Sequence, residues 1–238
     1  MMVMRLSYAL LLGFTCLATL GAAEIEGTVV VKHRLTRKKV TLTSGEYERG
    51  VAVQLGSDPA ERDFLAYERT HVVVYLEGDL PSTGTVAKME QKDRRFVPDL
   101  LVIPRGSTVS FPNLDPIFHN VFSLSKPKNF DLGNYRQGQT RLVTFSKPGI
   151  VLVNCRLHSN MAAAIVITPN QWSSKPDADG RFLLRNVPPG KHTVVAWHKS
   201  AGFFRQTITA SEAHPATVDF LVPLDENGVA TTQAFLPR

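Results

Sequence analysis

Residues 150–161 read Ile150-Val151-Leu152-Val153-Asn154-Cys155-Arg156-Leu157-His158-Ser159-Asn160-Met161, an apolar run that leads into a thiol, an imidazole and a thioether spaced three residues apart. A second imidazole, that of His119, lies thirty-six residues before the thiol. Two His and one Cys in a trigonal plane, with a weak axial Met, are the ligands of a blue-copper centre. The sequence therefore predicts that His119, Cys155, His158 and Met161 bind one copper ion.

Each of these four residues has a structural alternative. His119 can be a hydrogen-bonded core histidine, His158 an exposed loop residue, and Met161 a packing residue that leaves the axial position empty or to water. Cys155 can be a buried, inert thiol, which is common for cysteine.

The N-terminus is typical of a secretory signal peptide over residues 1–23. Arg5 provides the positive region, Leu6–Leu20 the apolar stretch, and Gly21-Ala22-Ala23 small residues for cleavage near Ala23. The apolar stretch is shorter than the roughly 20 residues that span a bilayer, so we expect export to the periplasm without stable membrane insertion. An uncleaved anchor is the alternative. Cleavage removes Cys16 and leaves Cys155 as the one thiol, which an oxidising compartment would attack if it were exposed and free.

The charge distribution and the motifs of the sequence argue against nucleic-acid binding and against catalysis. The net charge of +6 is partly concentrated in Lys32–Lys39, for which a solvated loop is the default interpretation and docking to an acidic partner or anionic lipid the alternative. Aromatic and basic residues do not interleave as in nucleic-acid binding proteins. The sequence shows no nucleophile–base arrangement and no phosphate-binding loop, so we expect a protein that is not an enzyme.

The chain is expected to be all-β, because short runs rich in Val, Ile, Phe and Thr alternate with Gly and Pro. One short helix is expected at Pro59–Tyr67, with Asp58 as its N-cap. The expected strands are Ile25–Val31, Thr70–Leu76, Asp99–Ile103, Thr108–Pro112, Asn120–Leu124, Thr140–Phe145, Ile150–Asn154, Ala163–Thr168, Arg181–Arg185, His192–His198, Gln206–Ala210 and Thr217–Val222.

The positions of the proposed ligands predict how two of these strands pair and where the ligand loop lies. Thr140–Phe145 and Ile150–Asn154 are predicted to form a hairpin turned by Lys147-Pro148-Gly149, whose second strand delivers Cys155. Arg156 to Asn160 then form a tight loop, Met161 opens the next strand, and His119 comes from a neighbouring strand.

Two stretches resemble domain boundaries, Gly78–Pro81 and Asn170–Asp179. They divide the chain into residues 24–80, 81–169 and 170–238. The middle segment holds all four proposed ligands and is long enough for a small sandwich. The two flanks have too few strands to stand alone, so we expect them to join into a second sandwich with the copper segment inserted between its halves.

The segment from Phe96-Val97-Pro98 to Thr168 resembles the cupredoxins. It carries Arg105-Gly106-Ser107-Thr108-Val109, Phe111-Pro112-Asn113, His119-Asn120-Val121, Lys147-Pro148-Gly149-Ile150 and Val153-Asn154-Cys155. The short Cys-x-x-His-x-x-Met spacing is most similar to that of the amicyanins. The resemblance implies a Greek-key sandwich, a type 1 copper ion and a hydrogen bond from the backbone N–H of Asn120 to the thiolate. It also implies an apolar surface around the loop histidine, with candidates Pro116, Ile117, Phe118, Leu157 and Ala162 to Ala164. Cupredoxin loops often carry proline next to the loop histidine, whereas this chain has Leu157 and Ser159.

The flanks resemble a carboxypeptidase regulatory-like (transthyretin-like) domain. Ile25-Glu26-Gly27-Thr28-Val29 and Val72-Val73-Val74-Tyr75-Leu76 are similar to its first strands, and Asp177-Ala178-Asp179-Gly180-Arg181-Phe182 and Val187-Pro188-Pro189-Gly190-Lys191-His192 to its turns. Residues Lys32 to Arg69 depart from the pattern as a long insertion. The whole chain resembles exported bacterial proteins described as methylamine-utilisation or plastocyanin-like.

These observations give three functional hypotheses. The first is a single-electron carrier that serves a cytochrome or a dehydrogenase-like partner. The second is a periplasmic copper chaperone or buffer that uses the same ligands without redox traffic. The third is an adhesion or carbohydrate-binding module, suggested by the flanks alone. The other histidines lack metal-ligand spacing, and Asp177–Gly180 is predicted to be a β-turn and not a calcium loop.

Overall fold

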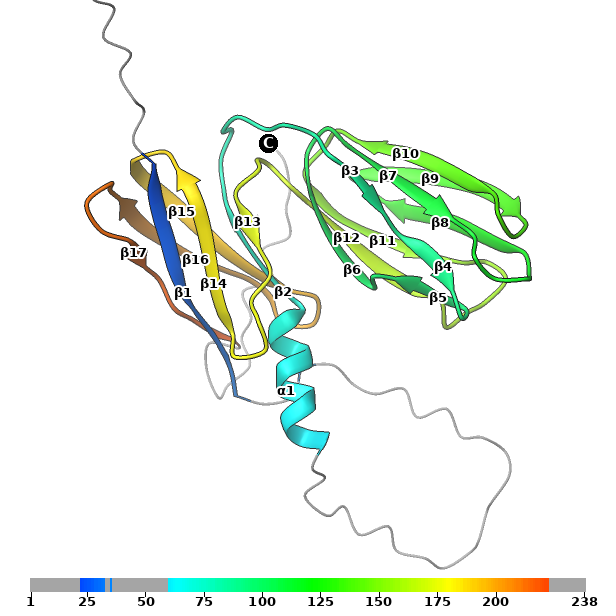
Figure 1. The fold of residues 1–238 in the computed structure, drawn as a ribbon, viewed down its shortest axis with the longest axis horizontal. Helices are drawn as coiled ribbons and strands as arrows, with labels where there is room; N and C mark the ends of the chain where they lie inside the picture. The colour runs from blue at the N-terminus through cyan, green and yellow to red at the C-terminus, as the bar shows by residue number, and fades with distance from the viewer. Residues whose placement is uncertain (1–21, 33–34, 36–59, 223–238) are drawn as a thin grey trace, which may run out of the picture.

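The computed structural model describes residues 22–32, 35 and 60–222. Residues 1–21 of the predicted signal peptide, the N-terminal end of the predicted helix and most of the Lys32–Arg69 insertion lie outside these residues. Within them the chain is almost entirely β, as expected (Figure 1). No helix among the described residues is long and apolar enough to cross a membrane.

Two of the sheets are built from strands near the N-terminal and C-terminal ends of the described chain, and we call this pair of sheets the flanking sandwich. One sheet joins β1 (Ala23–Val31), β14 (Arg181–Val187), β17 (Ala216–Thr217) and β18 (Phe220–Val222). The other has the order β13 (Ser173–Ser174), β2 (Val72–Leu76), β15 (Gly190–His198) and β16 (Gly202–Ala210). Their facing apolar side chains form one buried cluster that includes Ile25, Val74 and Phe220.

The strands between β2 and β13 form the central sandwich. A five-stranded sheet has the order β6 (Leu100–Pro104), β12 (Ala162–Thr168), β11 (Gly149–Asn154), β8 (His119–Ser125) and β9 (Lys128–Tyr135). It faces a three-stranded sheet of β10 (Thr140–Phe145), β7 (Ser107–Pro112) and β3 (Val86–Lys88). A two-stranded ribbon, β4 (Glu90–Lys92) and β5 (Arg95–Val97), completes it. Cys155 and Met161 belong to its buried core.

The two sandwiches pack against each other through the middle layers (Figure 1). β2 reads Val-Val-Val-Tyr-Leu and all five side chains are buried, as in a strand that is covered on both faces. Val72, Val74 and Leu76 enter the core of the flanking sandwich, whereas Val73 and Tyr75 meet Leu100 and Val166 of the central sandwich. Whether the two sandwiches correspond to separate domains, and whether the flanks are regulatory-like, stays a prediction.

One helix is described, α1 (Ala60–Thr70). It ends three residues later than predicted, so Thr70 belongs to the helix and not to the following strand. The Thr70 hydroxyl donates to the carbonyl of Tyr67 at 2.9 Å within the last turn. This side-chain bond helps explain why a β-branched residue closes the helix here.

The predicted hairpin of β10 and β11 is wrong. β10 pairs along its whole length with β7, whereas β11 pairs with β12 and β8 in the opposite sheet. Lys147-Pro148 therefore connects two layers instead of two neighbouring strands. The two strands are close in sequence, which favoured the hairpin interpretation. Their apolar side chains instead meet in the core between the two sheets, where Val143, Phe145, Val151 and Val153 belong to one buried cluster.

Candidate metal centre

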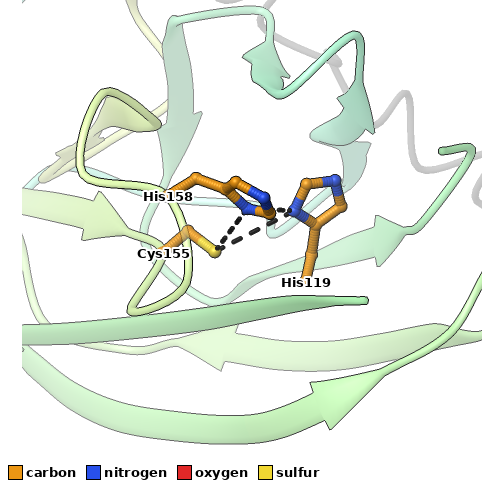
Figure 2. A group of neighbouring side chains, drawn as sticks. All are labelled: His119, Cys155 and His158. Carbon is orange, nitrogen blue, oxygen red and sulfur yellow. Dashed lines mark hydrogen bonds between the residues drawn. The ribbon is translucent and has the colours of Figure 1, made fainter. Parts of the chain in front are cut away.

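Three of the four predicted ligands converge at one end of the central sandwich (Figure 2). His119 is the first residue of β8, Cys155 directly follows β11, and His158 lies in the loop after it. Cys155 Sγ lies 3.9 Å from His119 Nδ1 and 3.7 Å from His158 Nδ1, and the two nitrogens are 3.1 Å apart. The neighbouring strands β8 and β11 pair at Phe122 and Asn154, which brings His119 beside Cys155.

The backbone explains the three-residue spacing. The last residue of β11, Asn154, pairs with the first residue of β12, Ala162, so residues 155–161 form the loop between two paired strands. The N–H of Cys155 donates to the carbonyl of Met161 at 3.1 Å, and the N–H of Met161 donates to the carbonyl of His158 at 3.0 Å. These bonds close the loop tightly and hold the thiol and imidazole on the same side.

Met161 lies in the same buried cluster as Cys155 and is 1% exposed. Its position next to the start of β12 agrees with the predicted loop. Its role as an axial ligand stays a prediction, because packing alone also accounts for a buried methionine here.

A carboxylate that the sequence analysis missed orients His119. His119 is fully buried, and its Nε2–H donates to Asp115 Oδ2 at 2.7 Å. This bond fixes the proton on Nε2, so the lone pair of Nδ1 faces the cluster. The signal in the sequence is weak, since Asp115 is merely an acidic residue four positions before the histidine.

Asp115 is itself held by the turn between β4 and β5. The backbone N–H of Asp93 donates to Asp115 Oδ1 at 2.7 Å and that of Arg94 to Asp115 Oδ2 at 2.9 Å. Burial alone would raise the pKa of Asp115, but the hydrogen bonds from Arg94, His119 and Asp93 outweigh it and lower the pKa below 3.8. Asp115 is therefore an anion that accepts from three donors.

Asn120 connects the thiol to the neighbouring strands. Its backbone N–H donates to Cys155 Sγ at 3.4 Å, as the cupredoxin resemblance implied. The side-chain Nδ2 of Asn120 donates to Asp131 Oδ1 at 2.7 Å, and its side-chain Oδ1 accepts the backbone N–H of Arg156 at 3.4 Å. The Arg156 guanidinium bonds Asp131 Oδ2 at 3.0 Å and lies over the ring of Phe122, which the sequence did not predict.

His158 is the most exposed of the three converging residues. Burial is the largest influence on the pKa of His158 and lowers it, and the nearby Arg94 cation acts in the same direction, which favours the neutral ring that binds metals. Of the predicted apolar surface residues, Phe118 is 58% and Leu157 is 47% exposed, and Pro116 and Ala162 are also exposed. Ala163 and Ala164 are buried, and Ile117 is half-buried.

The three donor atoms fit a metal ion. For metal bonds of about 2.0 Å to nitrogen and about 2.3 Å to sulfur, a trigonal plane places the nitrogens about 3.5 Å apart and each nitrogen about 3.7 Å from the sulfur. The observed separations of 3.1, 3.9 and 3.7 Å agree with this arrangement.

None of the other described histidines belongs to a group of side chains that could hold a metal ion, and three of them have hydrogen-bond or ion-pair partners. His198 Nε2 lies 3.0 Å from Glu68, His71 pairs with Asp99, and the His192 ring bonds the carbonyl of Pro188. His33 lies outside the described residues. In the predicted turn at Asp177–Gly180, the N–H of Gly180 donates to the carbonyl of Asp177 at 3.0 Å, which confirms a β-turn.

No protein-family model matches the chain, and no curated protein matches it. Solved structures similar to it include a copper-containing nitrite reductase, a purple cupredoxin and an amicyanin. The copper-containing nitrite reductase of Thermus scotoductus SA-01 is 26% identical with a TM-score of 0.33, over 37% of this chain and 22% of its own. A purple cupredoxin of Nitrosopumilus maritimus is 21% identical with a TM-score of 0.32, over 34% and 99%. A reduced tryptophan-to-tyrosine mutant of amicyanin is 17% identical with a TM-score of 0.33, over 40% and 97%.

Proposed function

We propose that this chain is an exported type 1 copper protein that carries single electrons between redox partners and is not an enzyme. The observation that carries the proposal is the convergence of His119 Nδ1, Cys155 Sγ and His158 Nδ1 within 3.9 Å of one another. A bound copper ion supplies one-electron chemistry by alternating between Cu(I) and Cu(II).

The surrounding residues favour electron transfer because they hold the donors in place. Cys155 is 5% exposed and accepts the Asn120 N–H, while His119 is locked by Asp115. A rigid donor set changes little between two oxidation states, which keeps the reorganisation cost of electron transfer low. His158 reaches the surface near exposed Leu157, so its ring edge is the proposed point of electron entry and exit.

The test is reconstitution of the full chain with Cu(II) and measurement of the visible spectrum. We expect an intense thiolate-to-copper band that Cys155→Ser abolishes and that His158→Ala removes or strongly shifts. His214→Ala is the matched control, because His214 is exposed and distant in sequence from the loop, and it should leave the band unchanged. A colourless copper complex, or a band that survives Cys155→Ser, contradicts the proposal.

Two further measurements on the copper-loaded protein, its redox behaviour and its retention of copper, distinguish an electron carrier from a copper chaperone. An electron carrier should show a reversible one-electron potential and retain copper when a competing acceptor is added. Rapid loss of copper to an acceptor, with slow electron exchange, would instead support the chaperone.

A further inference from the structure

A hollow of about 580 Å³ lies where the two sandwiches meet, away from the ligand cluster. Its walls come from both sandwiches, with Tyr75 and Phe203 on one side and Ile150 and Val166 on the other. The volume falls within the roughly 300–1,000 Å³ that is typical of small-molecule sites. Its lining is predominantly apolar, so an apolar body gains free energy by leaving water there.

Two lysines line the same hollow, and both belong to Lys-Pro pairs. Lys126-Pro127 forms the turn between β8 and β9, and Lys147-Pro148 connects β10 to β11. The turns meet closely, because a Cβ added at Gly149 would lie 2.6 Å from Pro127 Cγ. The absence of a side chain at Gly149 therefore lets two segments far apart in sequence place their lysines beside one hollow.

The charge of the hollow is not balanced by the described part of the chain. No Asp or Glu lines it, and neither Lys126 nor Lys147 forms an ion pair with a described carboxylate. An apolar hollow bordered by two cations is complementary to a molecule with an apolar body and an anionic head.

Tyr75 provides a hydrogen-bond donor in the wall. It is 5% exposed, and no described residue bonds its hydroxyl. Burial is the largest influence on this phenol and raises its pKa, so the hydroxyl keeps its proton and can donate.

We propose that this hollow binds a single-chain aliphatic carboxylate of the fatty-acid class, taken from solution. The chain packs against Ile150, Val166 and Phe203, and the carboxylate pairs with Lys126 and Lys147. This site is independent of copper, since none of the residues that line the hollow belongs to the ligand cluster.

The experiment is calorimetric titration of the full chain, without copper, with dodecanoate below its micelle concentration. We expect saturable binding of one dodecanoate per chain. Lys126→Gln with Lys147→Gln should weaken binding by about tenfold or more, because both charge partners of the head group are lost. The control Lys191→Gln with Lys199→Gln removes the same charge from exposed positions and should leave the affinity unchanged.

Further probes test the head group and the source of the ligand. Dodecylamine has the same tail with a cationic head and should bind at least tenfold more weakly. Ile150→Trp places a larger side chain in the wall of the hollow and should abolish binding, with circular dichroism used to confirm the fold. Absence of dodecanoate binding, equal binding by the lysine variant, equal binding of dodecylamine, or binding only to phosphatidylglycerol vesicles overturns the proposal.

Discussion

Asp115 is the residue that most directly controls the geometry of His119. Its carboxylate accepts the Nε2–H of His119 and is fixed by the N–H groups of Asp93 and Arg94. Asp115→Asn keeps the size of the side chain but removes the charge and one acceptor oxygen. We expect copper affinity to fall by about 10- to 100-fold, as is common when the partner of a metal-binding histidine is lost.

Competition with a chromophoric chelator measures this change. Asp177→Asn is the matched control, because Asp177 also caps a turn by accepting N–H bonds, from Asp179 and Arg181, but lies in the flanking sandwich. Equal affinity in Asp115→Asn and Asp177→Asn would show that Asp115 does not position His119.

Arg156 and Asp131 form a charge pair beside the thiol, and their separate removal should shift the reduction potential in opposite directions. Arg156→Gln leaves the Asp131 anion, which favours Cu(II) and lowers the potential. Asp131→Asn leaves the Arg156 cation, which favours Cu(I) and raises it. Each shift should be on the order of tens of millivolts, because both groups are partly exposed and screened. Cyclic voltammetry measures both, and shifts of the same sign would contradict the argument.

The convergence of three candidate ligands was predictable from their types and spacing, whereas the groups that orient them were not. Cys155, His158 and Met161 lie in one loop, and a loop between paired strands keeps neighbours in sequence close in space. Asp115 owes its position to a turn twenty-two residues away at Asp93, and Arg156 to Asp131 on β9. Such contacts depend on tertiary packing, which a local pattern does not contain.

The β4–β5 turn carries two residues in the left-handed region, Asp93 at φ 53° and Arg94 at φ 56°. Two-residue hairpin turns with both central residues in this region prefer Asn-Gly or Asp-Gly. Arg94→Gly should therefore raise the free energy of unfolding by about 0.5–1 kcal/mol while keeping the N–H that binds Asp115. Thermal unfolding measures the gain. Arg94→Ala retains the Cβ and should show none, so an equal gain in both variants would contradict the strain argument.

At the scale of elements, strand positions were better predicted than strand partners. β10 was predicted with its observed bounds, yet its partner is β7 and not β11. Among the described residues, five short or polar strands were missed. β9 is an example, because Gly133 and Asn134 interrupt its apolar pattern, while its pairing with β8 supplies the hydrogen bonds that hold it. Pairing is a property of two segments, so the composition of one cannot fix it.

The described part of the molecule is a stack of two sandwiches in which β2 and most of β12, at their contact, are covered on both faces. The unbroken apolar runs of β2 and β12 are explained by this burial, since an exposed sheet face would alternate with polar residues. The sequence predicted that the flanks join around the middle segment, and the strand pairings follow that grouping. The domain boundaries themselves stay a prediction, because the interface between the sandwiches is itself apolar and continuous.

Asp99 of the central sandwich contacts Tyr67 and His71 at the C-terminal end of α1. The pH dependence of the free energy of unfolding therefore tests this contact. Asp99 accepts from Tyr67 at 3.1 Å and lies 3.1 Å from His71 Nε2. The hydrogen bond from His71 is the main cause that lowers the pKa of Asp99 to about 2, below its ordinary 3.8. A carboxyl whose pKa is lowered by folding stabilises the folded state above its unfolded pKa. The contribution is therefore present above about pH 4 and lost as the pH falls to about 2.

Asp99→Asn should accordingly destabilise the protein by about 1 kcal/mol or less at pH 7, a small value because Asp99 is half-exposed. The difference from the unsubstituted chain should become much smaller near pH 2, where about half of the Asp99 carboxyl groups are protonated. Urea unfolding at both pH values measures the two differences. Asp79→Asn, which removes an exposed carboxylate paired with Arg105, is the control and should change stability less at pH 7. A difference for Asp99→Asn that is the same at both pH values would show that its charge does not hold α1 against the central sandwich.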